Sequence, residues 1–177
     1  MQKTLSRIIE AAKVRSLPFL IIGGNALILL GYIRNTIDID LLVESEKRSK
    51  WLDLMRELGL RFLHGTSAFA QFEPVETGDP GIDLMFVDSA TWKKLSDCSR
   101  IGQAAGHEVR MPKPEHLVAL KLHAASSATR SSPGIDWEDV RQIIRICGLD
   151  IRDPEFRELV RHYGGKEAID RIESFQK

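Results

Sequence analysis

The stretch that decides the fold is GGNALILLGYIRNTIDIDLLV, residues 23–43 of a 177-residue chain. Two glycines, Gly23 and Gly24, end one apolar run, and a second apolar run carries Asp38 and Asp40. Side chains at i and i+2 of a strand share a face, with Cα atoms ~6.6 Å apart. The two carboxylates are therefore expected to point together, away from the side on which Ile37, Ile39 and Leu41 lie.

Two neighbouring carboxylates repel each other, and burying them without compensation costs several kcal/mol. A divalent cation between them is the simplest remedy, and oxygen ligands favour Mg²⁺ or Mn²⁺. Asp83 stands in a similar apolar run, GIDLMFV (81–87). If the two strands are neighbours, Asp38, Asp40 and Asp83 form a three-carboxylate site able to hold two metal ions, as phosphoryl or nucleotidyl transfer requires. The alternative is an acidic strand end at a solvated edge, which the flanking isoleucines and LLV disfavour.

The glycine pair follows a buried strand and precedes a helix, where backbone N–H groups can approach a phosphate closely. The chain lacks the Lys-Ser/Thr of a P-loop and the third glycine of a dinucleotide fingerprint, so neither motif applies. A tight turn without a ligand is the alternative. Asn25 is placed to cap the helix. Arg34 is expected to contact a phosphate or to hold an aspartate in place, and Thr36 precedes the acidic pair.

Composition and periodicity predict an α/β (α+β) protein. Acidic and basic residues balance at 25 each, and 43% of residues are hydrophobic, which suits a soluble, cytoplasmic protein with no membrane span, no secretion signal and reduced cysteines. Residues 1–112 are predicted to form the α/β core, and residues 113–177 a helical segment packed on it, so that the two could count as one domain. Helices are predicted at 2–15, 25–33, 45–59 and 89–97 and in four segments after Pro114; strands at 19–24, 37–43, 61–65, 68–74, 81–87 and 107–112; and a mobile loop at 126–134.

The helical segment carries several charged residues. Lys121 stands in an apolar helix, HLVALKLHAA (116–125), where it either extends its ammonium past the core to solvent or reaches a site. Asp136 and Asp139 follow one turn apart and, taken alone, would be ordinary surface charges.

Taken in order, these motifs resemble the nucleotidyltransferase superfamily of the DNA polymerase β type. The resemblance implies a small mixed sheet with flanking helices, followed by a C-terminal helical segment. The Arg-x-Thr-x-Asp-x-Asp pattern and the later lysine and aspartates look more like its small bacterial branch, which includes abortive-infection-type toxins. The resemblance implies Asp38, Asp40 and Asp83 as catalytic metal ligands, and Gly23, Gly24, Asn25, Arg34 and Thr36 at the nucleotide. It also implies a catalytic, nucleotide-contacting role for Lys121 and a nucleotide contact for Asp136. Asn25 departs from the family motif, which often has a small residue there.

The activity implied is metal-dependent transfer of an NMP from an NTP, with ATP as an expected substrate, to an acceptor hydroxyl of tRNA or a protein, with Mg²⁺ or Mn²⁺ as cofactor. If the protein is an enzyme, the alternative acceptor is a small molecule of the aminoglycoside type. If it is not an enzyme, the alternative is a catalytically inactive protein of the same fold that acts as a binding or regulatory subunit of a toxin–antitoxin pair. An antitoxin partner and a homodimer are further expectations of the resemblance.

Overall fold

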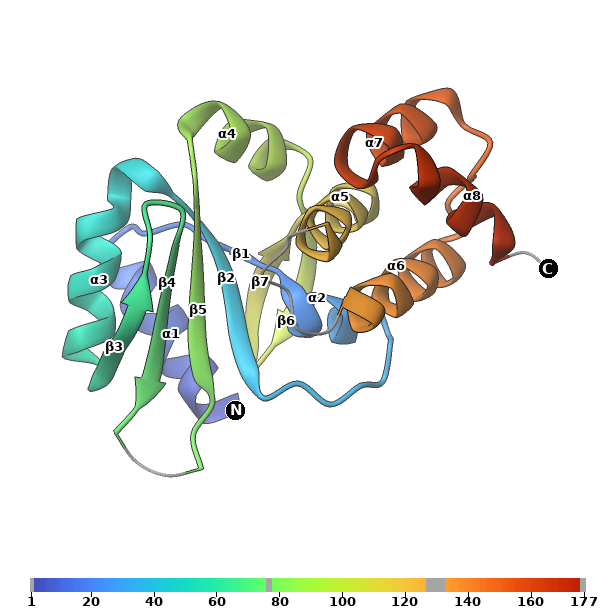
Figure 1. Ribbon diagram of the computed structural model, residues 1–177. Helices are drawn as coiled ribbons and strands as arrows, with labels where there is room; N and C mark the ends of the chain where they lie inside the picture. The colour runs from blue at the N-terminus through green and yellow to red at the C-terminus, as the bar shows by residue number, and fades with distance from the viewer. Residues whose placement is uncertain (1, 76–77, 127–132, 176–177) are drawn as a thin grey trace. The chain divides into compact units, whose positions relative to one another are not determined.

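The computed structural model describes residues 2–75, 78–126 and 133–175 (Figure 1). The chain divides into two compact units. One comprises residues 1–29 and 33–112, and the other comprises residues 30–32 and 113–177. Most of the loop predicted at 126–134 lies outside the described residues.

The first unit is built on a five-stranded sheet of order β1-β2-β5-β4-β3. Its centre is a parallel pair, β2 and β5, while β1, β4 and β3 are added antiparallel. This arrangement confirms the predicted mixed sheet. The strands are β1 (Leu20–Ile21), β2 (Asp38–Glu44), β3 (Leu60–Gly65), β4 (Phe69–Pro74) and β5 (Gly81–Val87).

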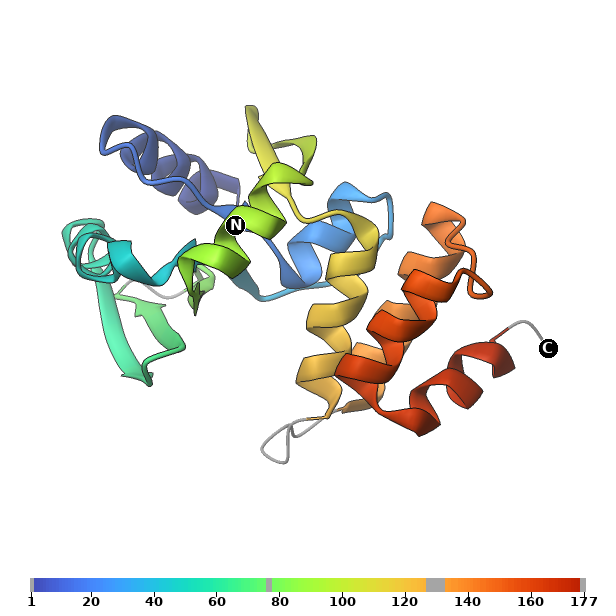
Figure 2. The ribbon, with the colours of Figure 1, turned by 90° about the horizontal axis from the view of Figure 1, so that it is seen from above.

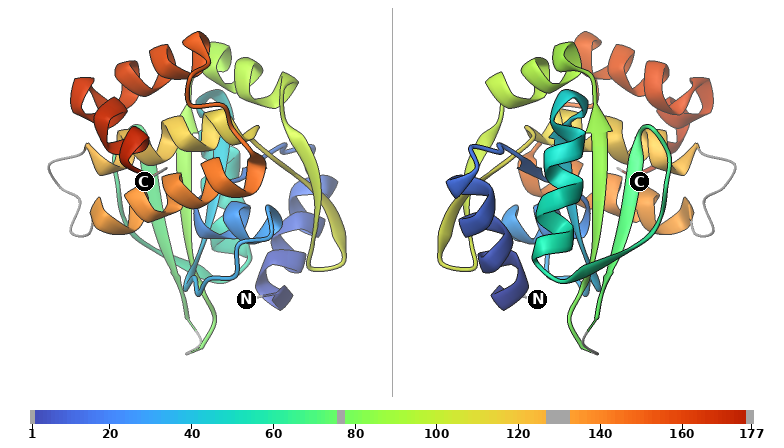
Figure 3. Two further views of the ribbon diagram at one scale, coloured as in Figure 1. Left: turned by 90° about the vertical axis from the view of Figure 1, so that its right-hand side faces the viewer. Right: turned by 90° about the vertical axis from the view of Figure 1, so that its left-hand side faces the viewer.

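Alternation along these strands separates an apolar face from a polar one. On the two central strands the apolar face is buried, and Ile39, Leu41, Ile82 and Leu84 have 0% exposure. Figure 3 (right) shows α1 (Gln2–Val14) and α3 (Arg48–Glu57) in front of the strands. Both helices contribute buried apolar side chains, among them Ile8 of α1 and Trp51, Leu54 and Met55 of α3. Apolar packing therefore covers this face of the sheet. The aspartates lie on the other face, where Leu42 of β2 is also buried.

Several predicted boundaries are wrong. β1 is a two-residue edge strand, shorter than the predicted 19–24. Helix α2 (Gly23–Leu29) ends four residues before the predicted Ile33, which is 96% exposed. Ile37 precedes β2 and is 80% exposed, so it is not a core neighbour of the aspartates. The helix predicted from Ser45 begins with a 3₁₀ turn, η1 (Ser45–Lys47), before α3.

A second, two-stranded sheet completes this unit. It pairs β6 (Arg100–Ala104) with β7 (His107–Met111) across a turn in which Ala105 and Gly106 have positive φ. The sequence predicted β7 but not β6, because RIGQA has no clear apolar alternation and all five of its residues are polar, small or exposed. Helix α4 (Ser89–Asp97) precedes this sheet and is capped by Asp88, whose side chain accepts a hydrogen bond from the Thr91 amide.

The second unit contains α5 (Pro114–Ala125), α6 (Pro133–Cys147), α7 (Pro154–Gly164) and α8 (Lys166–Ser174). Figure 2 shows these helices grouped together, with α6 and α7 each beside α5 and α8 beside α7. Prolines begin α5 and α7, and Asp153 caps α7 by accepting a hydrogen bond from the Phe156 amide at 2.8 Å. Buried side chains of all four helices, such as Leu122, Val140, Val160 and Ile169, form its core.

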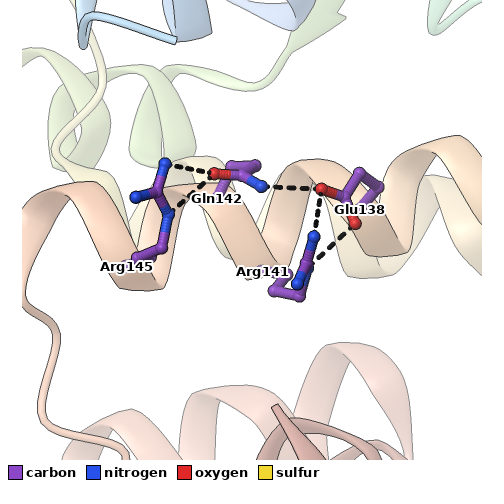
Figure 4. Close-up of polar contacts among 4 residues, drawn as sticks. All are labelled: Glu138, Arg141, Gln142 and Arg145. Carbon is purple, nitrogen blue, oxygen red and sulfur yellow. Dashed lines mark hydrogen bonds and ion pairs between the residues drawn. The ribbon is translucent and has the colours of Figure 1, made fainter. Parts of the chain in front are cut away.

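One side of α6 carries a ladder of polar contacts (Figure 4). Arg141 donates two hydrogen bonds to the Glu138 carboxylate, from Nε and Nη2. The Gln142 side-chain amide donates to the same carboxylate at 2.7 Å. Arg145 in turn donates to the Gln142 side-chain oxygen. The hydrogen bonds from Arg141 and Gln142 hold the pKa of Glu138 below its ordinary value. Because these residues recur every three or four positions, they support the helix along its length.

Across the described ranges, the chain contains no helix that combines the length and the apolar character needed to cross a membrane.

Candidate active site

The three predicted carboxylates lie on neighbouring strands. Asp40 of β2 is the direct register partner of Asp83 of β5, and Asp38 is the partner of Gly81. Register partners share a face of a sheet, and Asp38 shares the face of Asp40 because it lies two residues away. All three aspartates are half-buried, while their neighbours Ile39 on β2 and Ile82 on β5 are fully buried. The structure therefore gathers Asp38, Asp40 and Asp83 on the polar face of the parallel pair.

Two glycines make room for these carboxylates. A Cβ atom on Gly23 would lie 2.0 Å from Oδ2 of Asp40, and one on Gly81 would lie 2.5 Å from Oδ1 of Asp38. Gly23 also has a φ of +59°, in the left-handed region that favours glycine. No other residue type would leave both aspartate side chains where they are. Gly23 could be predicted from the sequence, but Gly81 could not, because its only signal is its position two residues before Asp83.

Residues around the glycine turn donate hydrogen bonds to the backbone carbonyls of β2. The Ile22 amide donates to the carbonyl of Asp40 at 3.0 Å, and the Asn25 side-chain amide donates to the carbonyl of Asp38 at 2.8 Å. The Thr36 hydroxyl donates to the same Asp38 carbonyl at 3.2 Å. Asn25 is buried in the first turn of α2, which begins at Gly23, so the prediction that it caps the helix is wrong. Its observed contact joins α2 to the strand that carries the aspartates.

The second glycine of the pair lies against the residues that precede β2. A Cβ on Gly24 would come within 2.8 Å of the Thr36 hydroxyl oxygen and within 3.4 Å of Nε of Arg34. The backbone of the turn, a hydroxyl and a guanidinium are thus close together, beside Asp40. The structure brings together Gly23, Gly24, Arg34 and Thr36 as the sequence predicted, and their contact with a nucleotide stays a prediction.

The donor set suits a hard cation. In the part of the chain that the structure describes, no three His, Cys, Asp or Glu side chains converge closely enough to hold a metal ion by themselves. Magnesium does not require such a cluster, because it is commonly held by one or two carboxylates together with substrate phosphates. Asp38 and Asp40 point to one face, and the glycines leave that face free of Cβ atoms that would fill it. The residues fit Mg²⁺ or Mn²⁺, and the metal site stays a prediction.

A second charged cluster lies inside the helical unit. Nζ of Lys121 on α5 lies 3.0 Å from Oδ1 of Asp136 and 2.7 Å from Oδ2 of Asp139, both on α6. The two aspartate side chains are 0% and 2% exposed, and the lysine side chain is 12% exposed. The ammonium is thus held between two buried carboxylates instead of extending to solvent, and the description of the aspartates as surface charges is wrong. This cluster joins α5 to α6, and a contact of Lys121 or Asp136 with a nucleotide stays a prediction.

Replacing Gly23 by alanine tests the fit between the turn and Asp40. Gly59 offers the matched control, because it also has positive φ, +80°, but a Cβ there would meet nothing within 4 Å. Gly59→Ala should lose about 1–2 kcal/mol of unfolding free energy from backbone strain. Gly23→Ala should lose about 1–3 kcal/mol more, because the new methyl group also displaces a carboxylate. Urea titrations measure both, and equal losses would show that Asp40 does not fill this space.

Replacing Lys121 by methionine tests the buried cluster. Removing the ammonium leaves two buried aspartates without it, and the expected loss is about 3–5 kcal/mol of unfolding free energy. Adding Asp139→Asn to Lys121→Met should recover part of that loss, because one buried charge is then gone. Lys93→Met, which removes an exposed ion pair with Asp97, is the control and should change stability little. A small effect of Lys121→Met would argue against the cluster as a link between α5 and α6.

The fold of the chain can be compared with that of known proteins. A scan of protein-family models and a search of curated sequences found no match. Among solved structures, the chain is similar to the antibiotic-resistance factor ANT(2'')-Ia, at 20% identity and a TM-score of 0.70, over 99% of this chain and 97% of that one. It is also similar to the lincosamide antibiotic adenylyltransferase LnuA, at 14% identity and a TM-score of 0.59, over 81% and 98%. An antigenic nucleotidyltransferase-like protein from Paracoccidioides brasiliensis matches at 16% identity and a TM-score of 0.55, over 96% and 91%. The chain therefore has the nucleotidyltransferase fold.

Proposed function

We propose that this protein is a metal-dependent nucleotidyltransferase, which moves an NMP from an NTP to an acceptor hydroxyl. The observation that carries the proposal is the position of Asp38, Asp40 and Asp83 on one face of the parallel β2–β5 pair, beside the Gly23 turn. The nucleotidyltransferase fold of the whole chain supports it. A catalytically quiet protein of the same fold is the competing hypothesis, and it gives no reason for three half-buried acids on one face.

The glycine turn is the proposed site of the triphosphate. Backbone N–H groups at Gly23 and Gly24 can approach phosphate oxygens closely because neither residue has a Cβ. Arg34, whose Nε would lie 3.4 Å from a Cβ on Gly24, supplies a guanidinium suited to paired hydrogen bonds with phosphate. Thr36 holds the Asp38 backbone through its hydroxyl, so its proposed role is to position the aspartate.

Asp38 and Asp40 are the proposed ligands of Mg²⁺ or Mn²⁺. When bound together with the triphosphate, the cation would neutralise negative charge on the phosphates and on these two carboxylates. The protein's own contribution is to hold both carboxylates in place before the nucleotide arrives. Hydrogen bonds from Ile22, Asn25 and Thr36 to the carbonyls of Asp38 and Asp40 fix the strand from which these side chains project.

Asp83 is the proposed general base. It lies beside Asp40 on the neighbouring strand and can accept the proton of an acceptor hydroxyl. The acceptor oxygen then forms a bond to the α-phosphorus, and the bond from that phosphorus to the bridging oxygen of pyrophosphate breaks. Pyrophosphate leaves toward the glycine turn. Positioning and charge neutralisation supply most of the catalysis in such transfers.

The acceptor is the open part of this proposal, and tRNA, a protein and a small molecule are all candidates. Two structural neighbours suggest which small molecules to test first. ANT(2'')-Ia has been crystallised with adenylyl-2''-tobramycin, and LnuA with lincomycin. Those ligands belong to proteins that are 20% and 14% identical to this chain, so here they serve as test compounds. An antitoxin partner and a homodimer stay predictions.

A transfer assay tests the proposal. The protein is incubated with Mg²⁺, each α-³²P-labelled NTP, and total tRNA, cell protein, tobramycin or lincomycin. We expect label to move to one acceptor class and Asp83→Asn to lower the rate by roughly 10²–10⁴-fold, as for loss of a general base. Asp40→Asn should abolish transfer, while Asp53→Asn, an exposed aspartate on α3, should leave it unchanged. Binding of Mg²⁺ and NTP without transfer to any of these acceptors would favour the catalytically quiet protein.

A further inference from the structure

A row of polar side chains continues across the sheet beyond Asp83. Asp40 of β2 is paired with Asp83 of β5, Asp83 with Gln71 of β4, and Gln71 with His64 of β3. Directly paired residues share a face and have Cβ atoms about 4.5–5.5 Å apart. Gln71 is half-buried and His64 is exposed. The carboxylate face of the sheet therefore extends as a row of acid, acid, amide and imidazole over four strands.

An irregularity in β3 places the imidazole in this row. Arg61 pairs with Glu73 and Phe62 with Phe72, but the register then shifts, so that His64 faces Gln71. Without the extra residue, Leu63 would lie opposite Gln71 and the row would end in an aliphatic side chain. The His64 ring also lies beside Phe69, with ring centroids 5.7 Å apart. The row thus ends in two neighbouring rings next to a primary amide.

The direction of the proposed reaction gives this row a role. In-line transfer places the attacking oxygen and the leaving pyrophosphate on opposite sides of the α-phosphorus. The glycine turn, where pyrophosphate would leave, lies against Asp40 on one side of Asp83. Gln71 and His64 lie on the other side of Asp83, over β4 and β3. The acceptor therefore approaches over these two residues.

Resting on the proposed function, we infer that Gln71 and His64 are the residues that recognise the acceptor, and that they contact a hydroxylated ring, the chemistry of a sugar. The Gln71 amide can donate to one hydroxyl and accept from its neighbour. The rings of His64 and Phe69 offer flat surfaces to the apolar face of a sugar ring. Such a contact would hold the ring with one hydroxyl beside the Asp83 carboxylate. A free aminosugar and the terminal ribose of an RNA share this chemistry.

Nuclear magnetic resonance tests the inference. The protein is first loaded with Mg²⁺ and the non-hydrolysable analogue AMPCPP, and tobramycin or total tRNA is then added separately. We expect at least one probe to shift the Gln71 side-chain amide and His64 ring signals, and the probe that does so identifies the source of the sugar. If AMPCPP binds but neither probe moves these two signals, the inference is overturned. If neither AMPCPP nor the α,β-methylene analogue of any other NTP binds, the proposed function itself fails, and the inference falls with it.

Matched variants separate recognition from folding. Gln71→Ala and His64→Ala should each weaken binding of the active probe about tenfold, as loss of one or two hydrogen bonds or a ring contact would, and leave AMPCPP affinity within about twofold. Gln103→Ala on β6 and His123→Ala on α5 make the same substitutions at exposed positions outside the row and should change neither affinity. Equal effects of the row and control variants would contradict the assignment.

Discussion

The first unit holds three carboxylates, Asp38, Asp40 and Asp83, on one face of its five-stranded sheet, although they repel one another. Several features of the unit contribute to this. The buried alternate residues of β2 and β5 fix which way the aspartates point, because turning either strand over would expose Ile39 or Leu41. The parallel register then sets Asp40 beside Asp83. Gly23 and Gly81 provide the space in which the side chains of Asp40 and Asp38 lie. The proposed cation would relieve this repulsion, which links the fold to the proposed chemistry.

Much of this arrangement could be predicted from local sequence. The i, i+2 spacing of Asp38 and Asp40 required one face, the glycines required a turn, and the order of motifs led to the nucleotidyltransferase fold. The sequence did not show whether β2 and β5 are neighbours, so the pairing of Asp40 with Asp83 could be predicted only for the case that they are. Strand register depends on contacts between distant segments. Gly81 was missed for the same reason. Its importance arises from Asp38 on another strand, and nothing next to it in the sequence indicates that contact.

Other differences also have physical causes. Asn25 was expected to cap α2, since asparagine favours that position, but the helix begins two residues earlier and the side chain bonds the β2 backbone instead. Taken alone, Asp136 and Asp139 would have been ordinary surface charges, because helical period does not show which face a charged residue takes. Lys121 compensates them within the helical unit, so three charges are buried together. The bulge that aligns His64 with Gln71 has no local sequence signal either, although it decides which side chain extends the polar row.

In the proposed site, Asp38 and Asp40 bind nucleotide through a shared metal ion. Isothermal titration calorimetry of AMPCPP, with Mg²⁺ and with EDTA, measures this dependence. We expect binding with Mg²⁺, loss of binding with EDTA, and loss in Asp38→Asn and Asp40→Asn. Binding should be retained in Asp83→Asn, because the proposed role of Asp83 lies with the acceptor. Equal affinity with and without metal, or unchanged affinity in both aspartate variants, would contradict the proposed site.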